Sequence, residues 1–186
     1  MGNLEMKLIP DLYAPINPNK GAAGFSLGMC YVDFLEQAEH LFINDYLNEM
    51  HSDSIWRIYE QRVFNEITQI QYNFNYCYWQ DSVVLVFNGD NSELESIQLY
   101  PGYKGALFKE FYIGNSLSKL HEKFKFFFYA DMHYLIDSDS DSDSDSDEEE
   151  PVLIKGVALK TDYLVEYSDT YCDHVIEQIN VFKVNT

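Results

Sequence analysis

The chain has 186 residues, 46% of them hydrophobic and 16% aromatic, which is enough apolar material for one large core or two small ones and excludes general disorder. The net charge of −19 predicts repulsion from nucleic acid and from anionic membranes, so we expect neither as a partner. Three dispersed cysteines favour reduced thiols, and the first residues lack a basic flank with an apolar run, so we expect a cytoplasmic protein.

An amphipathic helix is the first predicted element. Apolar residues recur at helical spacing over residues 34–42, and acidic side chains occupy the opposite face. Asp33, Glu36 and Glu39 are therefore candidates for a surface that meets a cationic partner, although such acids usually form only a solvated helix face. Gly28, just before this helix, predicts a backbone turn or a close approach that a side chain would block.

A strand with one aromatic face is predicted over residues 70–78. Aromatic or apolar residues alternate there with amide residues and one cysteine, which is a period of two. We interpret the aromatic face, with Tyr72, Phe74 and Tyr76, as lining the core. The other strands predicted in this half of the chain are 55–59, 83–87 and 97–100.

Two tryptophans are candidate anchors of a binding surface, because Trp is enriched at binding hot spots. Trp56 lies in the first predicted strand. Trp79 falls out of phase with the aromatic stripe of residues 70–78, so we expect its side chain to be exposed. Burial in the core is the alternative for both side chains.

The second half of the chain repeats this plan. Ser116 is a candidate N-cap for a helix that extends to Phe124. Residues 137–150 include six Asp and three Glu, whose mutual repulsion predicts a disordered hairpin loop. That tract lacks the glycine turn of calcium-binding loops, so we expect no calcium site. The strands predicted here are 132–136, 152–159, 163–167 and 175–184.

Two ten-residue segments are similar to each other. Residues 25–34 and 111–120 both read Phe-x-(Leu/Ile)-Gly-x-(Cys/Ser), followed by a helical apolar pattern. This duplication predicts an α+β fold of two similar helix-plus-antiparallel-sheet units in tandem, packed as one compact body. The first unit is 1–102, and the second is 103–186 with the acidic loop 137–150.

No grouping typical of an active site or a metal centre is present in the sequence. The five histidines are scattered and form no zinc motif, and the nucleophile-elbow, P-loop and dinucleotide-binding motifs are absent. Cys30 lies at a predicted helix start, where a thiol can be activated, but Ser116 takes the same place in the second segment and favours capping or packing. We therefore expect no catalysis, no cofactor and no metal.

The repeated helix entry resembles the unit of the β-lactamase-inhibitor-protein-like fold. It reads Gly-x-(Cys/Ser) at residues 28–30 and 114–116 and is followed by predicted strands. Small outer-membrane assembly lipoproteins have a similar entry. The resemblance covers roughly residues 25–100 and 105–184 and implies a fold of two such units. Cys30 stands where serine is usual, and no lipobox is present.

Three segments resemble the small acidic immunity proteins that are encoded beside bacterial polymorphic and contact-dependent toxins. They are Gly24–Gly28, Ile97–Gly105 and Ile113–Leu117. The resemblance implies a cytoplasmic inhibitor that binds one cognate toxin domain and needs no cofactor. A toxin that acts on nucleic acid would present a basic groove, which a negatively charged protein could occlude.

The leading hypothesis is therefore an immunity protein, with Asp33, Glu36, Glu39, Trp56 and Trp79 as candidate partner-binding residues. An acidic mimic of nucleic acid, or another protein-binding regulator, is the alternative. A third hypothesis is an enzyme whose site is assembled from distant carboxylates and histidines. The identity of the toxin, the binding face and the oligomeric state stay open.

Overall fold

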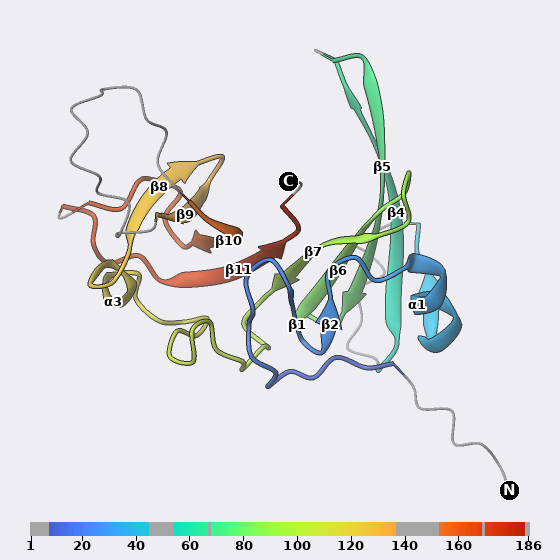
Figure 1. The fold of residues 1–186 in the computed structure, drawn as a ribbon, viewed down its shortest axis with the longest axis horizontal. Helices are drawn as coiled ribbons and strands as arrows, with labels where there is room; N and C mark the ends of the chain where they lie inside the picture. The colour runs from blue at the N-terminus through green and yellow to red at the C-terminus, as the bar shows by residue number, and fades with distance from the viewer. Residues whose placement is uncertain (1–7, 45–53, 67, 137–152, 169, 185–186) are drawn as a thin grey trace, which may run out of the picture.

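The computed structural model describes residues 8–44, 54–66, 68–136, 153–168 and 170–184. Its strands are β1 (Gly21–Ala22), β2 (Phe25–Ser26), β3 (His40–Phe42), β4 (Trp56–Asn65), β5 (Ile70–Trp79), β6 (Val83–Asn88), β7 (Leu94–Leu99), β8 (Lys125–Tyr129), β9 (Met132–Ile136), β10 (Leu153–Thr161) and β11 (Ile176–Phe182). Nine of them form one mixed sheet in the order β3-β4-β5-β6-β7-β11-β10-β9-β8 (Figure 1). Within this sheet only β3 and β4 are parallel neighbours.

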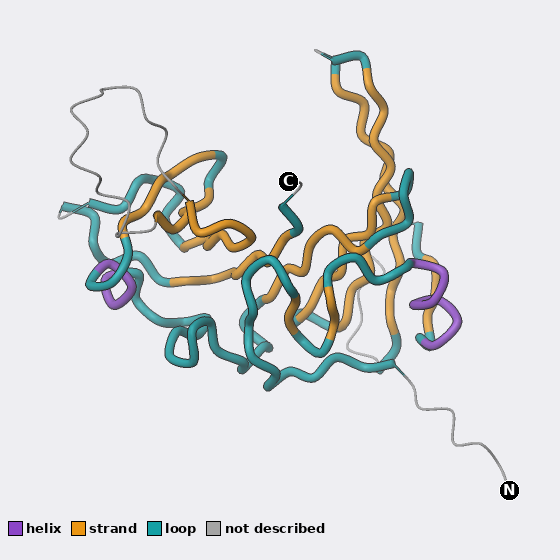
Figure 2. The backbone as a smooth tube through the Cα atoms, viewed as in Figure 1, coloured by secondary structure: helices purple, strands orange, loops and turns teal. Residues whose placement is uncertain are grey.

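The predicted α+β tandem repeat is wrong, because the described chain is mostly sheet. The helices α1 (Tyr31–Gln37) and α3 (Ser118–His121) have only seven and four residues (Figure 2). Strands from both halves of the chain also join in a single sheet, since β7 pairs with β11. The strands of residues 1–102 in this sheet, β3 to β7, and those of residues 103–186, β8 to β11, each occupy one contiguous half of it.

The first predicted helix ends early. The apolar spacing predicts a helix that includes residues 34–42, but the backbone is already extended at Ala38, and residues 40–42 pair with β4 as β3. A short apolar run fits the period of a helix and of a strand, and hydrogen bonding to an available strand edge decided between them. The second helix likewise stops before Phe124. Leu117 takes the N-cap position, but the Ser116 hydroxyl accepts a hydrogen bond from the Ser118 amide at 3.3 Å, so the capping contact predicted for Ser116 is present.

Seven of the eight predicted strands overlap an observed strand. The exception is 163–167, which is not a strand, whereas Lys125–Tyr129 forms the edge strand β8 without having been predicted. Because β9 and β10 are antiparallel neighbours, the acidic tract connects two paired strands. The predicted disordered loop 137–150 itself lies outside the described residues.

The two similar sequence segments make matching hydrogen bonds. The Gly28 amide donates to the carbonyl of Leu94, the first residue of β7, and the Gly114 amide donates to that of Ile176, the first residue of β11. Each of these strand residues donates in return to the residue after the glycine. The glycine φ angles are 84° and 90°, so the backbone turn expected at Gly28 is confirmed.

One face of the sheet carries the core. Directly paired side chains point to the same side of a sheet. One such row crosses six strands, and all of its members are fully buried: Ile58, Cys77, Leu85, Ile97, Val181 and Val157. The N-terminal segment, α1 and residues 100–117 lie on this side, which is the lower side in Figure 1. We call it the covered face.

The opposite side of the sheet is called the open face. The next row of paired residues crosses eight strands and mixes aromatic, amide and small apolar side chains with one arginine: Arg57, Tyr78, Val84, Gln98, Asn180, Ala158, Tyr134 and Phe127. A sheet with one apolar packed face and one such mixed face is expected for antiparallel strands with water on one side. Arg57, Val84 and Ala158 of this row are buried, whereas its aromatic and amide side chains are partly or fully exposed.

A two-stranded arm extends the open face. β4 and β5 pair along 57–65 and 70–78, but β6 pairs only with residues 74–79 of β5, so the distal parts of both strands project alone (Figure 1). Two strands alone are marginally stable in water. This arm also leaves large apolar side chains in contact with water, because Val63, Phe64 and Ile70 are 39%, 54% and 49% exposed.

Candidate functional site

The two candidate tryptophans are core residues. Trp56 is fully buried and Trp79 is 7% exposed, with their ring centroids 5.2 Å apart. The expectation of an exposed Trp79 is therefore wrong. Trp79 and Cys77 point to the same side of β5, and this side faces the N-terminal segment and α1. Neither indole can contact a partner without rearrangement of the core.

The three candidate acids lie on or just after α1 and are exposed. Phe34 of that helix is buried against the Trp56 and Phe87 rings, with centroids 5.2 Å apart in both pairs. The helix thus packs on the covered face, and Asp33, Glu36 and Glu39 point away from it into solvent. The structure does not unite these acids with Trp56 and Trp79 in one accessible surface.

The aromatic stripe of β5 lies on the open face. Tyr72, Phe74, Tyr76 and Tyr78 are half-buried, and successive ring centroids are 6.5, 6.2 and 6.3 Å apart. The interpretation that these rings line the core is therefore wrong. The alternation in the sequence identified the strand, but it did not show which side of the strand would be covered. The rings instead form a ladder at the surface.

A β-bulge modifies the open face next to this ladder. Val86 pairs with Ser96, whereas Phe87 pairs with Leu94, so Glu95 is an extra residue without a partner on β6. The Asn88 side-chain amide donates to Glu95 Oε1 at 2.8 Å. Because a bulge re-aims side chains, both Glu95 and Ser96 lie at the open face, which strict alternation would not allow.

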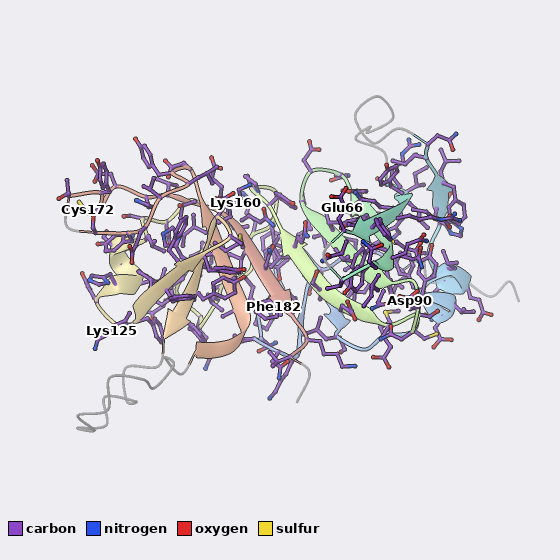
Figure 3. The ribbon with its side chains drawn as sticks, turned by 90° about the horizontal axis from the view of Figure 1, so that it is seen from above. Glu66, Asp90, Lys125, Lys160, Cys172 and Phe182 are labelled. Carbon is purple, nitrogen blue, oxygen red and sulfur yellow. The ribbon has the colours of Figure 1, made fainter. Side chains whose placement is uncertain are left out.

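The bulge borders a pocket in the open face. A row of paired residues places Val86 and Ser96, which are small, between the rings of Tyr76 and Phe182. The resulting pocket has a volume of about 310 Å³ and is also lined by Glu95. Figure 3 views the sheet from above, and Phe182 lies near its middle. We call this the bulge pocket.

The charged group at the bulge pocket that has no ion-pair partner among the described residues is the carboxylate of Glu95. Lys183 lies at its rim, but the ammonium group of Lys183 forms an ion pair with Glu93. Among the described lysines and arginines, none forms an ion pair with Glu95. Gln98 at the pocket floor accepts a hydrogen bond from the Tyr100 hydroxyl at 2.9 Å. The pocket therefore combines aromatic walls, oxygen acceptors and one carboxylate.

A second cluster of polar side chains is buried in the covered face. The rings of His133 and His174 are fully buried, nearly perpendicular, and 5.2 Å apart between centroids. His174 Nδ1 lies 3.1 Å from the Thr161 hydroxyl, but His174 Nε2 and both His133 nitrogens have no hydrogen-bond partner of good geometry. Unpartnered buried nitrogens are costly, and their protonated forms are costlier.

Burial lowers the pKa values of both histidines. Desolvation, with a smaller contribution from His174, lowers the pKa of His133 to about 4, although backbone groups of Val165 and Leu159 oppose the shift. Desolvation also lowers the pKa of His174, and the Asp162 carboxylate partly offsets it. Both rings are therefore neutral near pH 7.

This histidine pair does not form a metal centre with its neighbours. A cavity of about 210 Å³ adjoins His174, and its lining includes Tyr163, Cys172 and Asp173. However, no three His, Cys, Asp or Glu side chains within the described part of the chain are placed to hold a metal ion together. The burial of these two histidines therefore affects the free energy of unfolding, and the pair is not a candidate metal site.

No protein-family model, curated protein or solved structure matches this chain. No helix in the described ranges has the length and apolar character needed to cross a membrane. Roles for individual residues therefore come from the geometry alone. Sequence reasoning missed Glu95, Ser96 and Phe182, because the bulge and the pairing of β7 with β11 have no local signal.

Proposed function

We propose that this protein binds another protein through its open face and inhibits it by occlusion, as a cytoplasmic immunity protein that neutralises a cognate bacterial toxin domain. The observation that carries the proposal is the open face itself, where stacked rings border a pocket next to the exposed arm. Aromatic side chains in partly hollowed surfaces are typical anchors of protein interfaces.

Charge supports a basic partner. The chain carries a net charge of −19, and residues 137–150 contribute nine of its acidic side chains. A field of this sign accelerates association with a cationic protein and opposes binding to nucleic acid. A toxin domain with a basic nucleic-acid groove has the complementary charge. The open face would supply the short-range contacts that slow dissociation.

Co-expression tests the proposal directly. The protein should abolish the toxicity of the toxin domain encoded by the neighbouring gene, and purified domain and protein should form a stable complex. Unchanged toxicity together with no complex would rule out the immunity function. An acidic mimic of nucleic acid would instead lose activity gradually as several surface acids are removed, because its contacts are spread like phosphates.

Replacement of Tyr76 by alanine should weaken the complex with that toxin domain about thirtyfold, because a ring at the centre of an interface is a typical hot spot. Tyr76 is suited to this test since its ring is half-buried on the open face and lines the bulge pocket. Isothermal titration calorimetry would measure the dissociation constant, with circular dichroism to verify folding.

Glu36→Gln is the matched control, because Glu36 is exposed on α1 over the covered face. This change should alter the affinity less than about threefold, as expected for a rim charge. A large loss in Glu36→Gln with none in Tyr76→Ala would place the interface at α1 instead.

A further inference from the structure

The bulge pocket has a composition that selects for the charge of its ligand. Its walls are the rings of Phe74, Tyr76 and Phe182, and its floor includes Ser96 and Gln98. The faces of aromatic rings attract cations, and hydroxyl and amide oxygens accept hydrogen bonds. The Gln98 oxygen already accepts a hydrogen bond from the Tyr100 hydroxyl, and an apolar ligand would offer no donor to the Ser96 hydroxyl.

The carboxylate of Glu95 decides the sign of that charge. Asn88 donates to its Oε1 and thereby orients it, while its other oxygen has no hydrogen-bond partner among the described residues. Lys183 does not neutralise Glu95, because the ammonium group of Lys183 is engaged by Glu93. An anion would be repelled here, and a cation would gain a charge-assisted hydrogen bond.

We propose that the bulge pocket binds the guanidinium group of an arginine side chain presented by the partner. This inference rests on the proposed function, since it names the chemistry of the partner at one point of the open face. A guanidinium group is planar, stacks on aromatic rings and donates several hydrogen bonds in its own plane. An ammonium group is compact and strongly hydrated, so it matches ring walls less well.

The backbone supports a built site rather than a chance arrangement of side chains. The bulge places Glu95 beside Ser96, and the Lys183 amide donates to the Glu95 carbonyl at 2.8 Å, which ties the bulge to the end of β11. Ser96 also pairs directly with Phe182. The carboxylate, the hydroxyl and one aromatic wall are thus held by the same local hydrogen bonds.

The test uses small probes, so no partner protein is required. N-acetyl-arginine amide would be titrated into the full-length ¹⁵N-labelled protein at physiological salt, and the amide resonances would be followed by NMR. N-acetyl-citrulline amide, a neutral analogue of similar shape, and N-acetyl-lysine amide are the comparison probes. We expect millimolar binding of the arginine probe, with shifts centred on Glu95, Ser96 and Phe182, and about tenfold weaker binding of the citrulline probe.

Two variants make the site assignment falsifiable. Glu95→Gln should remove the preference for the arginine probe over citrulline, whereas Glu122→Gln, the same charge change at an exposed residue after α3, should keep it. Equal shifts with arginine and citrulline, equal binding of the lysine probe, or an unaltered response in Glu95→Gln would overturn the proposal. If the arginine probe does not bind, the arginine pocket is ruled out, but the proposed toxin complex is not. If the toxin complex does not form while the arginine probe still binds at Glu95, the immunity function is ruled out, but the arginine pocket is not.

Discussion

Replacement of Trp56 by alanine should lower the free energy of unfolding by about 4 kcal/mol, the largest loss expected from a single change in this chain. Trp56 is fully buried, and its ring contacts Phe25, Phe34 and Trp79 at centroid distances of 5.6, 5.2 and 5.2 Å. Its indole N–H also donates to the Leu8 carbonyl at 2.8 Å. The substitution would leave a cavity that these rings cannot fill and an acceptor without its donor.

Equilibrium urea denaturation of the wild type and the variant measures this loss. Phe64→Ala is the matched control, since it also truncates a large aromatic side chain of β4, but one that is 54% exposed on the arm. Its effect should stay within about 0.5 kcal/mol, as for most surface changes. Equal losses in both variants would contradict the assignment of Trp56 to the core.

Substitution of His133 by phenylalanine should stabilise the protein more strongly as the pH falls. The folded-state pKa of His133 is about 4, below the value of 6.5 expected in the unfolded chain. The unfolded state therefore takes up protons first, and the wild type loses stability as the pH drops from 6.5 to 4. The linkage for His133 alone is on the order of 3 kcal/mol.

The phenylalanine variant has no such proton to gain. At pH 7 it also removes two buried ring nitrogens that lack a hydrogen-bond partner of good geometry, so its stability there should equal or exceed that of the wild type. Urea denaturation of both proteins at pH 7, 5.5 and 4.5 isolates the effect, because the two proteins differ only at residue 133. The difference in free energy of unfolding should grow on the acid side.

His121→Gln serves as the control, because it removes the imidazole of an exposed residue instead of a buried one. Its stability should follow that of the wild type across the same pH range. A His133→Phe curve parallel to the wild type would contradict the burial of a neutral histidine. A loss of several kcal/mol at pH 7 would instead reveal a hydrogen bond at His133 Nδ1 or Nε2.

Much of the strand content was predictable because strand patterns are local. The alternation over 70–78 and the apolar run 83–87 predicted β5 and β6, and Gly28 predicted a backbone turn. The helices were overestimated, since an apolar run as short as 34–42 fits two periods. Within this run, residues up to Gln37 form α1, whereas residues 40–42 form a strand because the edge of β4 lies beside them.

The candidate site was less predictable, because its parts meet only in the folded sheet. Ser96 and Phe182 are distant in the sequence and become neighbours through the pairing of β7 with β11. The bulge at Glu95 arises from the register between β6 and β7, which no local pattern specifies. The same holds for His133 and His174, which come together only when a loop packs on the covered face.

The sequence by itself determined the period of each strand, the negative charge and the aromatic character of one side of β5. Only the tertiary structure decided that the tyrosines of this strand meet water while Trp79 and Cys77 are buried. An alternating strand has two faces of defined composition, but nothing in the alternation says which one another layer will cover. Here the N-terminal segment and α1 pack against the Trp79 side, and the aromatic ladder stays at the surface.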